Sequence, residues 1–143
     1  MEDERSQALA VATRALAKRD YSLRGLRERL ERAGVEPADA DEALAALEHA
    51  GLVSDARFAE RRAQALAERG KGNAAIRFDL ERQGVDAELA ETVVAALEPE
   101  RERAARIVSR HGAGPKTARL LAGRGFDAEL AERAAHGIVA PGS

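Results

Sequence analysis

Apolar residues recur every three or four positions along most of the chain, which is the spacing of one face of an α-helix. Leu23, Leu26 and Leu30 form one such face, and Leu89, Val93 and Leu97 form another. The chain is rich in Ala, Leu, Glu and Arg, which favour helix, and poor in β-branched residues. The pattern therefore predicts an all-α protein.

The helical pattern occurs in three related copies. Residues 30–35, Leu-Glu-Arg-Ala-Gly-Val, match residues 80–85, Leu-Glu-Arg-Gln-Gly-Val, and more loosely residues 121–126. Asp86–Glu91 recurs without change as Asp127–Glu132. Internal similarity at a regular period is the sequence signature of a repeat protein.

Each copy is predicted to form three helices. In the first copy we expect helices at about Gln7–Arg19, at about Leu23–Ala33 and after Pro37. So small a unit buries its apolar face poorly by itself, so the sequence predicts an elongated, curved array of three tandem three-helix repeats. The predicted segments are a loose N-terminal tail at 1–5, repeats at 6–53, 54–98 and 99–140, and a loose C-terminal tail at 141–143.

Specific residues mark the ends of these helices. Gly34, Gly84 and Gly125 each follow a helix, where a left-handed residue ends it without steric cost. Pro99 is expected to start a helix, and Ile138 to lie in the last one. The expected N-caps are Ser22, Glu36, Ser54, Asp86 and Asp127. Val53 and Phe58 then form a hydrophobic staple, which makes Phe58 a core residue and not a base-stacking platform.

The composition of the chain excludes several kinds of function. The chain has no cysteine, which excludes disulfides and thiolate chemistry, and no apolar run long enough for a membrane span. We therefore expect a cytoplasmic protein. The net charge of −2 argues against tight, purely electrostatic binding to nucleic acid. However, residues 101–124 contain seven basic residues and one acid, whereas residues 36–48 contain five acids and no Lys or Arg.

Several stretches resemble the RecX family of recombinase regulators. Residues 51–58, Gly-Leu-Val-Ser-Asp-Ala-Arg-Phe, resemble the family's Gly-Leu-x-x-Asp-x-Arg-Phe signature, and residues 20–30 resemble its Ser-x-x-Glu-Leu opening. Residues 69–72 and 116–126 follow at a similar spacing. Gly25 departs from the family's usual Glu, which removes half of a capping box.

The resemblance implies a fold of tandem three-helix units that lies along the groove of a RecA–DNA filament. It implies a negative modulator of recombination and DNA repair that inhibits the ATPase, strand-exchange and co-protease activities of RecA. The implied partner is RecA on single-stranded DNA. We expect a monomer without membrane contact, and weak binding to single- or double-stranded DNA stays open.

The residues predicted to contact the filament are basic and lie on the first and second helices of the repeats. Their expected role is to pair with acidic protein surface or with phosphate. The predicted set is Arg24, Arg27, Arg57, Arg61, Arg69, Lys71, Arg77, Lys116 and Arg119.

Two other binding functions stay open. Residues 112–118, Gly-Ala-Gly-Pro-Lys-Thr-Ala, resemble a helix-hairpin-helix turn that would bind DNA without sequence preference. A plain interhelical turn explains the same residues, and Pro115 excludes a phosphate-binding loop of the Walker A type. A scaffold between proteins would instead use the acidic third helices.

Catalysis is not expected. His49, His111 and His136 are scattered and do not form a helical pair that would bind a metal. No serine, histidine and aspartate pattern of a hydrolase stands out. The sequence therefore predicts a protein that is not an enzyme and that needs no cofactor.

Overall fold

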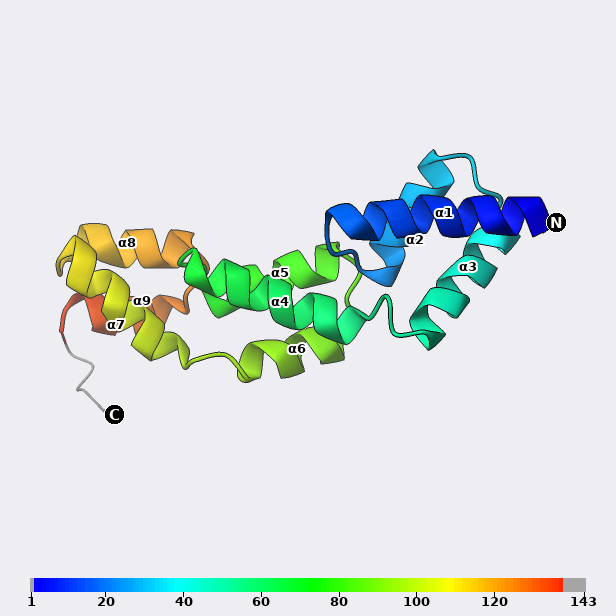
Figure 1. The fold of residues 1–143 in the computed structure, drawn as a ribbon. Helices are drawn as coiled ribbons and strands as arrows, with labels where there is room; N and C mark the ends of the chain where they lie inside the picture. Colours follow the sequence, from blue (N-terminus) through cyan, green and yellow to red (C-terminus); the bar gives the residue numbers. More distant parts are fainter. Residues whose placement is uncertain (1, 138–143) are drawn as a thin grey trace. The chain divides into compact units, whose positions relative to one another are not determined.

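The structure is a computed structural model that describes residues 2–137. Within these residues the chain forms nine α-helices and no strand (Figure 1). The helices are α1 (Glu2–Lys18), α2 (Leu23–Arg32), α3 (Pro37–His49), α4 (Asp55–Glu68), α5 (Asn73–Arg82), α6 (Ala87–Ala95), α7 (Glu100–His111), α8 (Pro115–Gly123) and α9 (Ala128–Ala135). The predicted all-α class and the succession of three-helix groups are confirmed. None of the described helices has the length and apolarity needed to cross a membrane.

Two helix starts differ from the prediction. Helix α1 begins at Glu2 and not near Gln7, so residues 2–5 are helical and the predicted loose tail is wrong there. The reason is that Glu2, Glu4 and Arg5 are good helix formers and extend the α1 helix without a break. Pro99 is the N-cap of α7 and not its first helical residue. The C-terminal prediction, including Ile138 and the tail at 141–143, falls outside the described residues.

The predicted helix ends are confirmed. The Ser22 hydroxyl accepts a hydrogen bond from the Gly25 N–H at 3.0 Å, and the Asp127 carboxylate accepts one from the Leu130 N–H at 2.9 Å. Asp86 caps α6 in the same way, Ser54 accepts from the Arg57 N–H, and Glu36 with Pro37 starts α3. Gly34, Gly84 and Gly125 have φ angles of 84°, 97° and 94°. These residues determine where the helices begin and end, because capping side chains and the turns at the glycines bond backbone groups that a helix end leaves without a partner.

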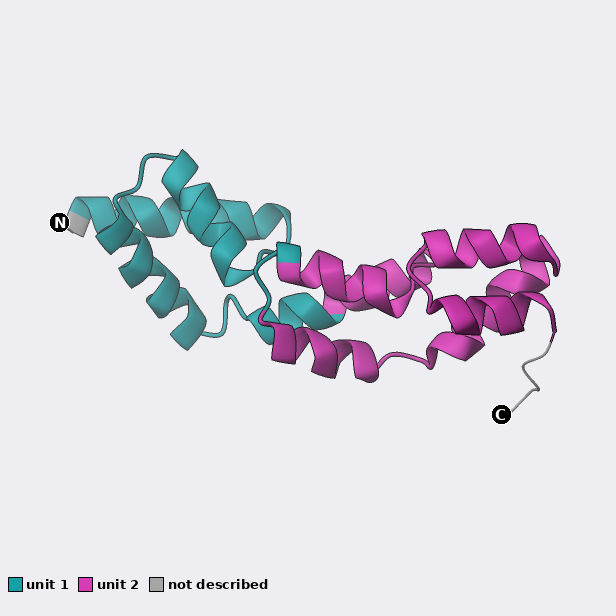
Figure 2. Ribbon diagram, turned by 180° about the vertical axis from the view of Figure 1, so that it is seen from behind, with its two compact units in different colours: residues 1–60, 82–85 teal, residues 61–81, 86–143 magenta. Residues whose placement is uncertain are grey.

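The chain divides into two compact units (Figure 2). Unit 1 comprises residues 1–60 and 82–85, and unit 2 comprises residues 61–81 and 86–143. The boundary passes through α4 and near the end of α5, so the two units do not coincide with the three predicted repeats. The repeat limits at 6–53, 54–98 and 99–140 stay a prediction.

Each unit has its own apolar core. In unit 1 the cluster joins α1, α2 and α3, and its members include Ala12, Leu26, Leu30, Leu44, Leu47 and Val53. In unit 2 a cluster of Ala104, Leu121, Phe126 and Ala131 joins α7, α8 and α9. Phe58, predicted to be core, is 7% exposed. Burial of these side chains provides most of the stabilisation that short helices lack when isolated.

A joint that we call the first seam lies within unit 1. Here the start of α2 contacts the turn at residues 82–85. The Ser22 hydroxyl donates to the Gln83 carbonyl, and the Arg24 guanidinium donates to the Arg82 carbonyl. The Asp55 carboxylate, on the first residue of α4, accepts a hydrogen bond from the Leu23 N–H at 2.8 Å.

An equivalent joint, the second seam, lies within unit 2, where the start of α5 contacts the turn at residues 124–126. The Gly72 N–H donates to the Arg124 carbonyl at 2.8 Å, and the Ala74 N–H donates to the Gly125 carbonyl at 3.1 Å. Glu100, the first residue of α7, accepts from the Asn73 N–H at 2.6 Å. A Cβ on Gly72 would lie 2.2 Å from the Phe126 nitrogen, so only glycine fits there.

Candidate partner-binding surface

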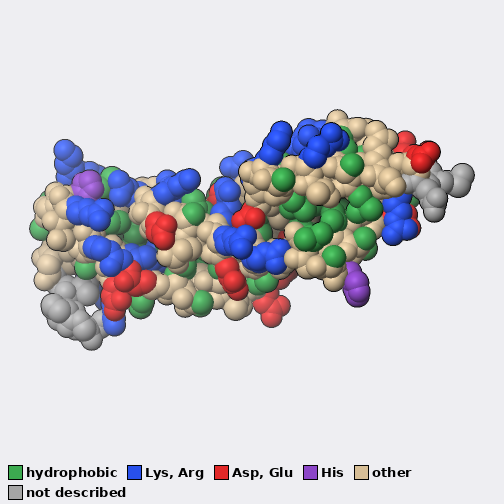
Figure 3. All heavy atoms as spheres, viewed as in Figure 1, with side chains coloured by type: hydrophobic (Ala, Val, Ile, Leu, Met, Phe, Trp, Pro, Cys, Tyr) green, Lys and Arg blue, Asp and Glu red, His purple; other side chains and the backbone are tan. Residues whose placement is uncertain are grey.

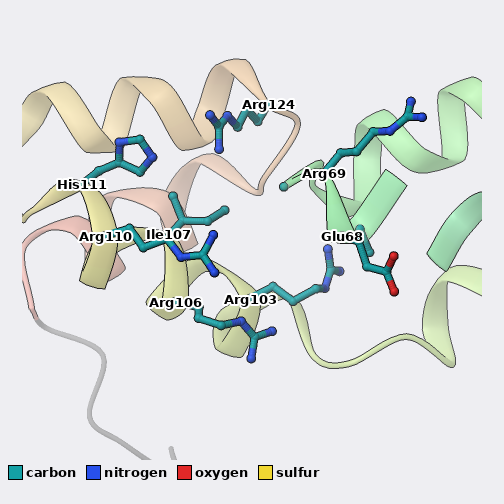
Figure 4. A pocket seen from close by; sticks show the side chains of 10 residues that line it. Glu68, Arg69, Arg103, Arg106, Ile107, Arg110, His111 and Arg124 are labelled. Atoms are coloured by element: carbon teal, nitrogen blue, oxygen red, sulfur yellow. The ribbon is translucent and has the colours of Figure 1, made fainter. Parts of the chain in front are cut away.

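A basic pocket of about 350 Å³ lies in unit 2, beside the second seam. Its walls come from the C-terminal end of α4 and the turn after it, from one face of α7, and from the residue that follows α8 (Figure 4). The basic residues that line the pocket are Arg69, Arg103, Arg106, Arg110 and Arg124, together with His111. Glu68 is the one carboxylate among the described lining residues. Such a pocket attracts anions because its walls are mainly of one charge.

Arg103 is built into the fold at the base of this pocket. It is 5% exposed, and its guanidinium donates to the carbonyls of Glu98 and Lys71, both at 2.9 Å, and to the Asn73 side chain. Its guanidinium carbon also lies 5.8 Å from the centre of the Phe126 ring. Burial lowers the pKa of Arg103, although the carboxylates of Glu100 and Glu98 oppose that shift. Arginine stays charged near neutral pH, so Arg103 adds a fixed positive charge.

Arg106 is neutralised inside the chain. It pairs with the Glu98 carboxylate, and its second nitrogen lies 3.2 Å from the other Glu98 oxygen. This hydrogen bond raises the pKa of Arg106 and lowers the pKa of Glu98. In Figure 4 the Arg106 guanidinium extends away from Ile107. Arg106 therefore contributes less free charge to the pocket than its neighbours.

Arg110 and Arg124 face one another across Ile107 in Figure 4. The Arg124 guanidinium lies over Gly70, where an added Cβ would be 2.9 Å from the Nη1 atom. Gly70 has a φ of 85°, which favours glycine for a second reason. The turn after α4 therefore approaches Arg124 closely because Gly70 has no side chain.

The predicted contact residues in unit 1 all have partners inside the chain. Arg24 donates to the Arg82 carbonyl and lies 3.5 Å from the Glu28 carboxylate. Arg27 pairs with Asp41. Arg57 donates to the Gly51 carbonyl at 3.1 Å and so braces the turn before α4. The structure therefore gives these three residues structural contacts, and it does not gather them into one pocket.

The predicted residues in unit 2 fall into two groups. Arg77 pairs with Glu91 at 3.7 Å, and Arg61 is exposed but also interacts within the structure. Arg69, Lys71, Lys116 and Arg119 are exposed, and no described carboxylate pairs with them. Of this second group only Arg69 lines the pocket, at its edge, and Lys116 and Arg119 lie on α8 outside it. On the face in Figure 3, Lys and Arg side chains lie over both units, and acidic side chains lie among those over unit 2.

Both glycine N–H groups of the turn at residues 112–114 already have partners inside the chain. The Gly112 N–H donates to the Val108 carbonyl at 2.7 Å, and the Gly114 N–H donates to the Ala135 carbonyl at 2.8 Å. Gly114 is the N-cap of α8, and Pro115 follows it. These contacts favour the interhelical turn over the helix-hairpin-helix, because a phosphate needs such N–H groups to be free.

Four pocket residues, Arg103, Arg106, Arg110 and Arg124, were not in the predicted contact set. The sequence contained a signal for them, since they belong to the basic run at residues 101–124. Arg103, Arg106 and Arg110 also have the i, i+3, i+7 spacing that places residues on one helix face. The contribution of Arg124 depends on the second seam, which no sequence spacing reveals.

Unit 1 contains a basic pocket of its own, of about 420 Å³. Its basic lining residues are Arg14 and Lys18 on α1 and Arg29 on α2, with Tyr21 between them. The Arg19 guanidinium carbon lies 4.1 Å from the centre of the Tyr21 ring. Nowhere among the described residues do three or more His, Asp or Glu side chains form a group that could hold a metal ion.

Part of the chain is similar in sequence to known proteins of the RecX family. The family model described as RecX, second three-helix domain, matches residues 54–94. Two proteins named Regulatory protein RecX, from two strains of Acidithiobacillus ferrooxidans, are each 47% identical over 60 residues. These matches cover 42% of this chain and 40% of each relative.

The fold is similar to that of two solved RecX structures. The crystal structure of RecX from Lactobacillus salivarius superposes with a TM-score of 0.83, over 96% of this chain and 98% of that chain, at 16% identity. A second structure, titled regulatory protein RecX, gives a TM-score of 0.77 over 92% of this chain and 71% of that one, at 15% identity. At such identities the similarity establishes the fold alone.

Proposed function

Because the chain resembles the RecX regulators in sequence and in fold, as the sequence analysis predicted, we propose that it modulates RecA. Its partner is the filament that RecA forms on single-stranded DNA. Binding lowers the ATPase, strand-exchange and co-protease activities of that filament. The observation that carries this proposal is the match to the second three-helix domain of RecX at residues 54–94.

The distribution of charge in unit 2 supports the proposal. Arg69, Lys71, Lys116 and Arg119 are exposed and have no carboxylate partner among the described residues. We propose that these four residues contact the filament, since exposed cations pair with acidic protein surface or with phosphate at little cost. Pairing of this kind sets the orientation and the association rate of a complex more than its affinity.

The paired arginines have a lesser part in this proposal. Arg24, Arg27 and Arg77 already have carboxylate partners in the chain. A new contact with the filament would have to break those pairs, each of which contributes about 0–1 kcal/mol at an exposed site. We therefore expect their substitution to change inhibition less than substitution of Arg69 and Lys71.

The test is a titration of the DNA-dependent ATPase of RecA with this protein. We expect inhibition below a one-to-one ratio to RecA, and a loss of potency in the double variant Arg69→Ala, Lys71→Ala. The matched control is Arg133→Ala, because Arg133 is an exposed arginine that pairs with Glu129 on its own helix. No inhibition by the wild-type protein would refute the proposed function. Equal potency of the double variant and the wild type would refute only the assignment of the contact residues.

A further inference from the structure

The basic pocket of unit 2 has more positive charge than its own carboxylates can neutralise. Arg103 and Arg106 are satisfied by the chain, through the carbonyls of Glu98 and Lys71 and through the Glu98 carboxylate. The guanidinium groups of Arg110 and Arg124 have no hydrogen bond or ion pair with any described residue. Like charges held close together repel each other, and a bound anion removes this repulsion.

The fold places Arg110 and Arg124 on two walls of the same pocket. Arg124 is half-buried and lies over Gly70, and its backbone carbonyl accepts the hydrogen bond from the Gly72 N–H in the second seam. Arg110 lies on the same face of α7 as Arg103, which is fixed by three hydrogen bonds. The pocket therefore brings two unpaired donors to one site, and the half-buried Arg124 loses less side-chain freedom on binding than a fully exposed arginine would.

The lining residues indicate which anion fits. No Phe, Tyr or Trp lines the pocket, and the His111 imidazole is the one aromatic ring among the described lining residues, so a nucleobase would find little stacking surface. Each guanidinium presents a planar pair of donors that matches two oxygens of a phosphate or a carboxylate. A carboxylate has two oxygens and a single negative charge, and a bidentate pair with one arginine already uses both oxygens. A phosphate group presents further oxygens and can accept from Arg110 and Arg124 together.

We propose that unit 2 binds a phosphate group in this pocket, with Arg110 and Arg124 as paired donors and Arg69 at the edge. The phosphate belongs either to a strand of nucleic acid or to a free polyphosphate. The volume of about 350 Å³ accommodates more than a single phosphate, so neighbouring phosphates of a chain fit as well. Arg69 is shared with the proposed filament contacts, but the test of this proposal does not involve RecA, so either proposal can fail without the other.

The experiment uses the full chain without RecA, and its two arms separate the sources of phosphate. In one arm, fluorescence anisotropy follows the binding of a labelled oligothymidylate. In the other, inorganic tripolyphosphate is titrated while the melting temperature is recorded. If the bound phosphate comes from a nucleic acid strand, we expect the double variant Arg110→Ala, Arg124→Ala to bind the oligothymidylate about tenfold or more weakly than the wild type. If it comes from a free polyphosphate, we expect the same loss for tripolyphosphate. If the source is a strand, the slope of log K against log salt also becomes shallower by about 0.7 for each phosphate that the variant no longer binds.

Arg101→Ala is the matched control, since Arg101 is an exposed arginine on the same helix that does not line the pocket. Should the double variant fail to fold, Arg110→Gln replaces it, because Arg110 is exposed and its substitution leaves the core intact. The proposal is overturned if the pocket variant and Arg101→Ala behave alike in both arms. It is also overturned if a polyglutamate peptide displaces either probe more effectively than tripolyphosphate does, because the pocket would then select carboxylates.

Discussion

The first and second seams form equivalent joints from different residues. In both seams, a carboxylate on the first residue of one helix accepts the N–H of the first residue of another. The pairs are Asp55 with Leu23 and Glu100 with Asn73. The remaining contacts differ, because the first seam uses side chains of Ser22 and Arg24, whereas the second uses the backbone of residues 72–74. The two seams therefore share the carboxylate contact, and their other donors are side chains in the first seam and backbone N–H groups in the second.

The residues beside the two carboxylates differ in the same way. Val53 and Phe58 flank the start of α4 and are 2% and 7% exposed. The equivalent positions at the start of α7 hold Glu98 and Arg103, which are joined by a hydrogen bond from the Arg103 guanidinium to the Glu98 carbonyl. A polar pair therefore replaces an apolar pair at the second seam, and this replacement places a buried cation beneath the basic pocket.

The largest effect is expected from Gly72→Ala. The added Cβ would lie 2.2 Å from the Phe126 nitrogen and 2.3 Å from the Gly125 carbonyl carbon, so the backbone contact must open. We expect the free energy of unfolding to fall by about 3 kcal/mol, as measured by denaturant unfolding. Gly123→Ala is the control, since an added Cβ there meets nothing within 4 Å. If Gly72→Ala left the free energy of unfolding unchanged, the second seam would not depend on close packing of its backbone.

The second largest loss of stability is expected when the buried Arg103 of the second seam is replaced by an apolar residue. Arg103→Phe introduces the residue that the first seam has at this position. We expect it to destabilise the protein by about 2–3 kcal/mol, because the carbonyl of Lys71 and the side chain of Asn73 lose their donor. Arg101→Phe is the matched exposed control. If Arg103→Phe were as stable as the wild type in thermal unfolding, packing would determine this position and hydrogen bonding would not.

A smaller loss is expected at the first seam. Ser22→Ala removes the N-cap of α2 and the donor to the Gln83 carbonyl, and leaves the surrounding chain in place. The expected cost is about 1–2 kcal/mol, which denaturant unfolding can measure beside Gly72→Ala. A cost greater than that of Gly72→Ala would reverse the comparison of the two seams.

The smallest effect is expected in how the stability of the protein depends on pH through the ion pair of Glu98 and Arg106. The Arg106 guanidinium holds the pKa of Glu98 below its usual value. The stabilisation from this pair is therefore fully present above the ordinary pKa of glutamate and is lost as the pH falls through the lower pKa of the folded state. We expect the wild type to lose slightly more stability than Glu98→Gln between about pH 6 and about pH 3. Parallel stability curves for the two proteins would show that the pair contributes nothing.

Local sequence signals predicted most of the fold. Ser22, Asp86 and Asp127 were assigned as caps, and each accepts the expected N–H. Such caps depend only on residues a few positions apart, so a single sequence reveals them. The start of α1 was placed too late, because Glu2, Asp3 and Glu4 form helix without a distinctive start signal.

The basic pocket could be predicted only in part. The basic run at residues 101–124 is evident in the sequence, yet Arg103 was not expected to be buried or Arg124 to reach Gly70. Both placements depend on the second seam, which joins residues far apart in the sequence. Likewise, Arg27 was predicted to contact a partner because Asp41 is brought to it only by folding, whereas the pairing of Arg24 with Glu28 at i, i+4 could be read from the sequence.

We propose that this protein recognises the RecA filament and not simply one of its components. The most direct test is to measure the affinity of the fluorescently labelled chain for RecA assembled on single-stranded DNA, for free RecA and for the bare DNA under one salt condition. We expect the filament to bind at least about tenfold more tightly than either component alone, which corresponds to about 1.4 kcal/mol. Equal affinity for the filament and for bare DNA would contradict it.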